Sequence, residues 1–514
     1  MPETPKLNGR AGNIVKNSTT GLINNVLPSI LRFFTRYVFI MYFGDTLLGV
    51  NSLFADVVTI FSFAEIGIYS AISFFLYKPI AEKDTERIQS FLGLYRKLNR
   101  YIMLAVTVIG LGFIPFLQLI KTQEPIPGLL IYYLIFLAQN ILSYMYAYRT
   151  TYLAASQKAY QLAHINVLIA FATEITQILV TILTRNFVAY LITYTVMMTT
   201  RILWSNHYIF KHYPETNFKH YQKLDHDTIW QFVRKLFSML LLKISELGVS
   251  QTDSMIVSTM VDVTQWGYVS NYMAIKKMTS LVLSSLAGGL VPSLGILSVV
   301  ESRERQEESF RLYNFCNTLL CINLFAGLVI LVPPFIELVF GTKRVLDDLT
   351  CFLLFFNVLY AGLLEPVAVL RDAMGQYERD KWINVSAFFC NLITSILFVK
   401  LFGLPGVFMG TLCSTTITYY RIYNVLHHAY NTDCKIYYSI ALKTVVLGLA
   451  IYGILHFGVF PLIWNSQRNL LGLVILGIAT VVVANAVFFL VNRKDPYLHS
   501  AVLLFKRFLP GRKA

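Results

Sequence analysis

Charged side chains are scarce in this sequence. Asp, Glu, Lys and Arg make up 14% of its 514 residues, and 56% are hydrophobic, whereas a soluble chain has about 25% charged residues. This composition indicates a polytopic membrane protein. Catalytic signatures are missing too: there is no G-x-x-x-x-G-K-[ST] for nucleotide phosphates and no H-E-x-x-H for zinc. We therefore expect no enzyme activity, no catalytic residues, no cofactor and no metal.

Cysteine is also rare. All six cysteines lie in the second half, and none forms C-x-x-C, so neither a disulfide framework nor a zinc site is predicted. The first twenty residues are polar and no cleavable signal peptide is recognisable. A net charge of +15 would suggest nucleic acid for a soluble protein. In a membrane chain it indicates cationic loops facing the cytoplasm and anionic lipid, and we expect no nucleic-acid partner.

What the sequence has in abundance is apolar runs. A membrane-spanning helix needs about 20 apolar residues, and polar segments divide the chain into fourteen runs of that kind. They are 21–43, 50–77, 99–120, 128–148, 161–184, 187–210, 237–261, 266–299, 313–340, 349–371, 382–402, 404–424, 438–460 and 469–492.

Lys and Arg give the orientation. With the N-terminus inside, the inside loops and tails hold 28 of these residues and the outside loops hold six. This bias follows the positive-inside rule. Both termini are therefore predicted to be cytoplasmic, and the outside loops are too short to hold a separate domain.

The chain also contains an internal repeat with an offset of 218 positions. Six spans separate equivalent positions, so the two halves run parallel, and membrane chains of this kind bind substrate between their halves. The matched pairs include Gly49 and Gly267, Ser52 and Ser270, Tyr95 and Tyr313, Asn166 and Asn384, and Thr176 and Thr394.

These patterns predict an all-α polytopic membrane protein of about 14 transmembrane helices. Two parallel six-helix repeats form two lobes, and two C-terminal helices follow. The predicted parts are an N-terminal lobe (1–210), a cytoplasmic linker (211–236), a C-terminal lobe (237–430), and the last two helices with a cytoplasmic tail (431–514).

Basic residues at membrane depth are the first candidates for a site, because such charges usually face a cavity or one another. Arg32 and Arg36 are four apart, hence on one helix face, and Arg32 is roughly 16 Å into its span. Lys276 and Lys277 lie at a comparable depth in the eighth run, and only one of the two can face a cavity. We predict that these four residues bind an anionic head group. The alternative for the arginines is a structural ion pair.

Acidic residues at the same depth are candidates for ion coupling or counter-charge. Glu65 lies in the middle of the second run, and Glu246 and Asp253 share one face of the seventh. Glu65 serves equally well as a proton-coupling site or as the partner of an arginine, and it is the first candidate partner of Arg32. Glu174, in the fifth run, and Glu365 are weaker candidates.

The run GVNSLFADVVTIFSFAEIGIYSAISFFLYKPIAEKD resembles the second-span region of bacterial polysaccharide flippases, members of the multidrug/oligosaccharidyl-lipid/polysaccharide exporter superfamily. AASQKAYQLAHINV and its equivalent AMGQYERDKWINV are similar to the segments that join spans 4–5 and 10–11 of that family. The similarity covers nearly the whole chain.

The resemblance implies a flippase that moves a polyprenyl-pyrophosphate-linked oligosaccharide across the bacterial cytoplasmic membrane by alternating access, for exopolysaccharide, capsule or wall-glycan assembly. Its partners would be that lipid-linked substrate, membrane lipids, and the glycan polymerase and glycosyltransferases of the pathway. Two alternatives stay open. A cation-coupled multidrug exporter of the same fold would need an acidic cavity, and a membrane glycan polymerase or ligase would need a long catalytic loop.

Overall fold

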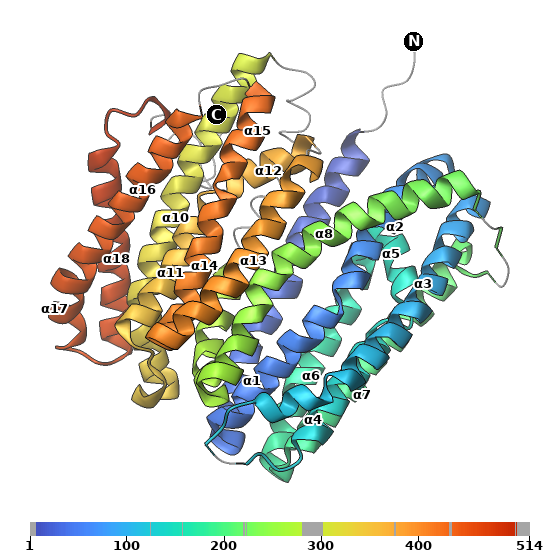
Figure 1. The fold of residues 1–514 in the computed structure, drawn as a ribbon, viewed down its shortest axis with the longest axis horizontal. Helices are drawn as coiled ribbons and strands as arrows, with labels where there is room; N and C mark the ends of the chain where they lie inside the picture. The colour runs from blue at the N-terminus through green and yellow to red at the C-terminus, as the bar shows by residue number, and fades with distance from the viewer. Residues whose placement is uncertain are drawn as a thin grey trace. The chain divides into compact units, whose positions relative to one another are not determined.

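The computed structural model describes residues 7–500, apart from 124, 157, 219–220, 223, 280–301, 375–376, 431–433 and 499. Within these residues the chain forms helices joined by short turns, with no β-strand (Figure 1). The all-α prediction is confirmed. Two compact units divide the chain, Met1–Gly267 and Tyr268–Ala514. The lobe limits predicted from the sequence stay a prediction.

The helices have the following bounds. In the first unit they are α1 (Leu7–Phe61), α2 (Phe63–Glu82), α3 (Thr85–Gly112), α4 (Leu129–Ser143), α5 (Ala147–Ala155), α6 (Ala163–Thr184), α7 (Phe187–His212) and α8 (His226–Ile256). A helical run over 263–279 crosses the limit between the units. In the second unit they are α10 (Arg303–Phe340), α11 (Asp348–Gly362), α12 (Glu365–Met374), α13 (Tyr377–Phe402), α14 (Leu404–Thr418), α15 (Tyr420–Tyr430), α16 (Lys435–Gly453), α17 (Phe460–Trp464) and α18 (Leu470–Val491).

The fourteen predicted apolar runs are mostly helical where the structure describes them, with short turns inside several of them. Among the described residues, seven helices are long and apolar enough to cross a membrane, and up to nine are if two bent pairs each count as one span. These pairs are α4 with α5, bent by 50°, and α11 with α12, bent by 41°. The chain is a polytopic membrane protein.

The first two predicted runs differ from the structure in where they break. α1 contains a kink at Gly44, whose φ of 78° suits glycine, and residues 45–61 form its second segment. The run 50–77, predicted as one span, is interrupted at Ser62, whose N–H donates to Val58 and Thr59 carbonyls at 3.2 and 3.1 Å. Asn140 of α4 donates to the Ser62 hydroxyl (2.8 Å) and the Val58 carbonyl (3.3 Å). An irregular turn at membrane depth needs such partners.

The internal repeat is visible in where helices begin and end. α3 begins at Thr85 and α10 begins 218 positions later; α5 and α12 have the same relation at their first residues, and α6 and α13 at their last. Arg185 and Gly403, also 218 apart, both have positive φ, 51° and 66°. The repeat read from scattered identities is therefore a repeat of backbone structure.

Described residues of the predicted linker 211–236 contact helices of the first unit. Glu215 accepts a hydrogen bond from the Tyr152 hydroxyl at 2.6 Å, and Arg96 lies over the ring of Phe218 at 5.0 Å. α8 then begins at His226 with Asp225 as its N-cap. This segment ties α3 and α5 to the start of α8.

In the second unit the last two apolar runs pack on α10. Asn485 of α18 donates to the side-chain carbonyl of Asn323 at 2.8 Å. Near the end of α10, Glu337 accepts a hydrogen bond from the Trp464 indole at 3.1 Å and pairs with Arg468 at 3.4 Å. Polar contacts therefore hold the C-terminal helices to α10 at two levels.

Candidate functional site: two cavities in the first unit

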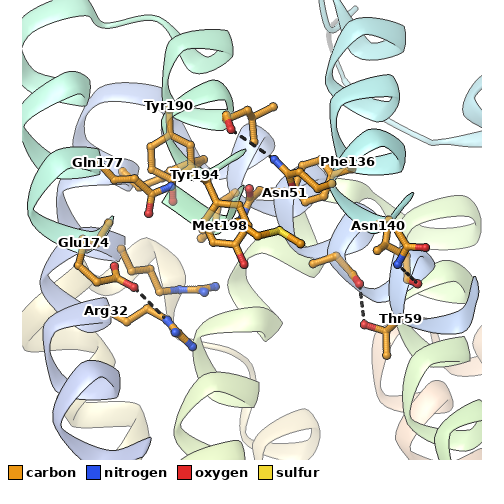
Figure 2. Close-up of a pocket in the computed structure, with 18 of the residues that line it drawn as sticks. Arg32, Asn51, Thr59, Phe136, Asn140, Glu174, Gln177, Tyr190, Tyr194 and Met198 are labelled. Carbon is orange, nitrogen blue, oxygen red and sulfur yellow. Dashed lines mark hydrogen bonds and ion pairs between the residues drawn. The ribbon is translucent and has the colours of Figure 1, made fainter. Parts of the chain in front are cut away.

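A cavity of about 480 Å³ lies between α1, α4, α6 and α7 in the first unit. Figure 2 shows the side chains that line it, with Arg32 and Glu174 on one side and Asn140 and Thr59 on the other. Its wall is mostly polar and aromatic. Besides apolar residues the lining contains the amides Asn51, Gln139, Asn140 and Gln177 and the rings of Phe39, Phe136, Tyr190 and Tyr194.

The charges in this cavity come from α1 and α6. Arg32 Nε lies 3.3 Å from Glu174 Oε1, and Arg36, one turn further along α1, lines the same cavity. Their spacing of four predicted this shared face. The partner of Arg32 is Glu174, however, and the expectation that Glu65 would be its partner is wrong. α1 packs along α6, and that places residue 174 beside residue 32.

An aromatic cluster lies beside the cavity at the start of α7. The Phe39 ring is 5.6 Å from that of Phe187 and 5.1 Å from that of Tyr190, and Tyr132 lies 4.7 Å from Phe187. Edge-to-face contacts of this kind stabilise packing beyond the buried area alone. The cluster joins α1 to α7 and fixes one wall of the cavity.

The amide side chains hold the remaining walls together. Gln139 of α4 donates to the Thr195 hydroxyl of α7 at 2.9 Å. Next to it, Asn140 donates hydrogen bonds to the Ser62 hydroxyl and the Val58 carbonyl at the break described above. Gln177 follows Glu174 by three residues on α6, so the two side chains face the cavity together. The site is thus built on hydrogen-bonded helices rather than on loops.

A second cavity, of about 380 Å³, adjoins the first, and both are lined by Ser143 and Met198. It contains Glu65, in the first turn of α2 just after the break at Ser62, and Arg201 of α7. A carboxylate near a helix N-terminus is favoured by the helix dipole. No hydrogen bond or ion pair links Glu65 or Arg201 to another residue in the described part of the chain.

The other predicted site residues are placed as follows. Asp253 is 3% exposed on α8, and the side chain of Glu246 lies outside the described residues. Lys276 is half-buried and Lys277 exposed, on the helical run 263–279. The convergence of these lysines with Arg32 and Arg36, and the coupling role of the three acids, stay predictions.

Arg201 and the cavity amides were not predicted from the sequence, and Glu174 was predicted only as a weaker candidate. Arg201 was not chosen as a candidate because it lies toward the cytoplasmic end of its predicted span, where a basic side chain can reach the membrane surface. Spacing could have found Glu174, since Glu174 and Gln177 form a polar pair on one face of an otherwise apolar run.

Comparison of the chain with protein-family models and with curated proteins finds no match. Solved structures do match. The lipid II flippase MurJ in an inward closed conformation aligns with a TM-score of 0.65 at 16% identity, over 91% of this chain and 98% of that one. The Vibrio cholerae MATE transporter VcmN aligns with a TM-score of 0.60 at 11% identity, over 83% and 98%.

This chain shares the fold of these flippase and MATE transporter structures. A third match is a MOP transporter from Pyrococcus furiosus, for which reverse polarity of the binding pocket suggested a different function; its TM-score is 0.58 at 13% identity, over 80% of this chain and 94% of that one. The family resemblance stated from the sequence is therefore confirmed at the level of fold. At these identities the likeness carries no site residue across, so the site rests on the geometry above.

Proposed function

We propose that this protein is a flippase that moves a polyprenyl-pyrophosphate-linked oligosaccharide across the bacterial cytoplasmic membrane by alternating access. The glycan would serve exopolysaccharide, capsule or wall assembly. Both termini would be cytoplasmic, as the Lys and Arg bias favours. The partners would be the lipid-linked substrate, membrane lipids and the polymerase and glycosyltransferases of the same pathway.

The observation that supports this proposal is the chemistry of the first cavity. Its charged residues are Arg32, Arg36 and Glu174, two cations and one anion. A pyrophosphate needs charge-assisted hydrogen bonds when it leaves water, and arginine supplies them in pairs. The surrounding amides and tyrosines offer donors, acceptors and flat faces that suit sugar rings. An excess of positive charge beside such groups fits an anionic glycan carrier.

A cation-coupled multidrug exporter is the second candidate, and Glu65 favours it. This carboxylate faces the second cavity with no ion-pair partner among the described residues, and a cationic drug could pair with it. Arg201 in the same cavity opposes that reading, because it would repel a cation. The combined cavities hold more basic than acidic side chains.

The test is to replace Arg32 in cells that need the glycan. We expect Arg32→Ala to stop export and to leave lipid-linked glycan on the cytoplasmic leaflet, with normal protein level. Arg32→Lys should keep part of the activity, since the charge remains while the bidentate geometry is lost. Leaflet distribution is measured by accessibility of the glycan to an impermeant lectin or oxidant.

The Glu174→Gln variant separates transport from structure. If Arg32 only neutralises Glu174, Arg32→Ala should lower protein level and the double variant with Glu174→Gln should restore level and export together. If Arg32 binds substrate, the double variant stays inactive. A folded and fully active variant lacking both Arg32 and Arg36 would exclude this anion site, and drug resistance conferred by the native protein would favour the exporter.

A further inference from the structure

The ion pair between Arg32 and Glu174 is unequal. The Arg32 side chain is 69% exposed and that of Glu174 is 7% exposed. A guanidinium has five N–H donors, and only Nε is directed at Glu174, at 3.3 Å. In the described part of the chain no hydrogen bond uses the Arg32 Nη groups. Arg32 can therefore turn to a ligand in the cavity, whereas Glu174 is held in the cavity wall with little of its side chain exposed.

The cations that face the same cavity as Glu174 come from α1. The helices packed on α6 are α1 and α7, with a short turn at 159–162 at the other end. From α1 the cations Arg32 and Arg36 face the same cavity as Glu174, and from α7 the tyrosines Tyr190 and Tyr194 do. Tyr160 lies in that turn, and His164, on α6 itself, is ten residues away, about 15 Å along the helix.

We propose that Glu174 is a proton-binding site coupled to the anion site: an anionic group that enters the cavity takes Arg32 from Glu174, and Glu174 then binds a proton. This inference rests on the proposed function. Without a bound anion, Glu174 is the hydrogen-bond acceptor for Arg32. When the anion leaves, Arg32 returns to the carboxylate and the proton is released to water.

The physical reason is the cost of a buried carboxylate without its cation. Such a group is strongly destabilising when its partner is removed, and neutralisation by a proton is the usual response. Anion and proton therefore bind together, and each raises the affinity for the other by the same factor, as linkage requires. A structural ion pair would show no such coupling.

The experiment uses the purified full-length protein in detergent and ethane-1,2-disulfonate as the probe. This dianion does not titrate between about pH 5 and pH 8, so any change in its affinity reports on the protein. We expect the Kd of the native protein to rise with pH, by up to about tenfold per pH unit. Glu174→Gln should bind with a Kd that is tighter at the high-pH end and independent of pH.

Glu337→Gln is the matched control, because Glu337 also pairs with an arginine, Arg468, at 3.4 Å but lies outside the cavity. It should keep the native pH dependence. A second measurement needs no variant: addition of the probe to weakly buffered native protein should take up as much as one proton per bound dianion. A Kd independent of pH in the native protein, or a dependence that survives Glu174→Gln, overturns the coupling and leaves the anion site standing. No binding at any pH contradicts the anion site and the proposed function with it.

Discussion

Thr46 and Thr264 occupy the same position in the two halves of the repeat, 218 residues apart, and their side-chain oxygens lie 3.1 Å from each other. Gly49 and Gly267 flank this contact and are also equivalent. A Cβ on Gly49 would lie 1.9 Å from the Val263 carbonyl oxygen. One on Gly267 would lie 2.5 Å from the carbonyl oxygen of Asp45, the repeat equivalent of residue 263.

This contact is reciprocal: residue 49 meets residue 263, and residue 267 meets residue 45. The second segment of α1 and the start of the helical run 263–279 approach so closely there that only glycine fits. The two glycines matched in the sequence as a mark of duplication are thus the points at which the repeated helices touch.

Gly49→Ala is expected to destabilise the protein. The added methyl group would meet backbone rather than a flexible side chain, and overpacking of this kind costs typically about 1–3 kcal/mol. Thermal unfolding in detergent measures the effect. Gly327→Ala in α10 is the control, because nothing lies within 4 Å of its Cβ position, and it should be neutral or stabilising. Equal behaviour of the two variants would disprove the close approach.

Asn140→Leu is expected to destabilise the turn at Ser62, which interrupts the predicted second span. The change removes hydrogen bonds to the Ser62 hydroxyl and the Val58 carbonyl, and the loss of one such bond typically costs about 0.5–1.5 kcal/mol. Combining it with Ser62→Ala should cost less than the sum of the two single changes, since the variants share a contact. Strict additivity in thermal unfolding would show that the two residues act independently.

Asp380→Asn is expected to destabilise the second unit severely. The Asp380 side chain is 1% exposed; it accepts a hydrogen bond from Arg371 at 2.5 Å and forms an ion pair with Arg421 at 2.7 Å. Loss of the negative charge leaves two buried guanidiniums, and breaking a buried pair costs about 3–5 kcal/mol. Thermal unfolding and membrane yield report the loss.

The first unit offers a comparison for the triad of Arg371, Asp380 and Arg421. At the positions 218 residues earlier the sequence has three leucines: Leu153, Leu162 and Leu203. Replacing all three charged residues by leucine should therefore recover much of the stability, as apolar substitution of buried ion pairs often does. If the triple variant is as unstable as Asp380→Asn, the triad has a role that the repeat position does not explain.

The start of α8 is expected to fray at low pH. Hydrogen bonds from the Thr228 hydroxyl (2.6 Å) and backbone N–H (2.9 Å) hold the pKa of Asp225 below its usual range. A lowered pKa means that the capping contribution is present above about pH 4 and is lost as pH falls through the folded-state value. Limited proteolysis near residue 225 should then increase. Asp225→Ala should show this susceptibility at neutral pH, whereas Asp225→Asn, still a good cap, should remove its pH dependence.

Arg32 shows where sequence reasoning succeeds and where it stops. Its shared face with Arg36 follows from a spacing of four on one helix, and the structure places both in one cavity. Its partner did not follow, because Glu65 and Glu174 are both acids near the middle of apolar runs. Which of them meets Arg32 depends on which helices are neighbours, and neighbours in space are not encoded by periodicity along one helix.

The amino-acid sequence by itself determined the all-helical membrane class, the positions of the apolar runs and the 218-residue repeat, because these follow from local hydropathy, charge and spacing. Tertiary structure alone decided that α1 packs on α6 and that Arg201 shares a cavity with Glu65. It also decided that Asn140 of α4 and Tyr144, the residue after this helix, surround the break at Ser62. Those contacts join residues dozens of positions apart, and they form only where side chains from different helices fit together and satisfy each other's polar groups.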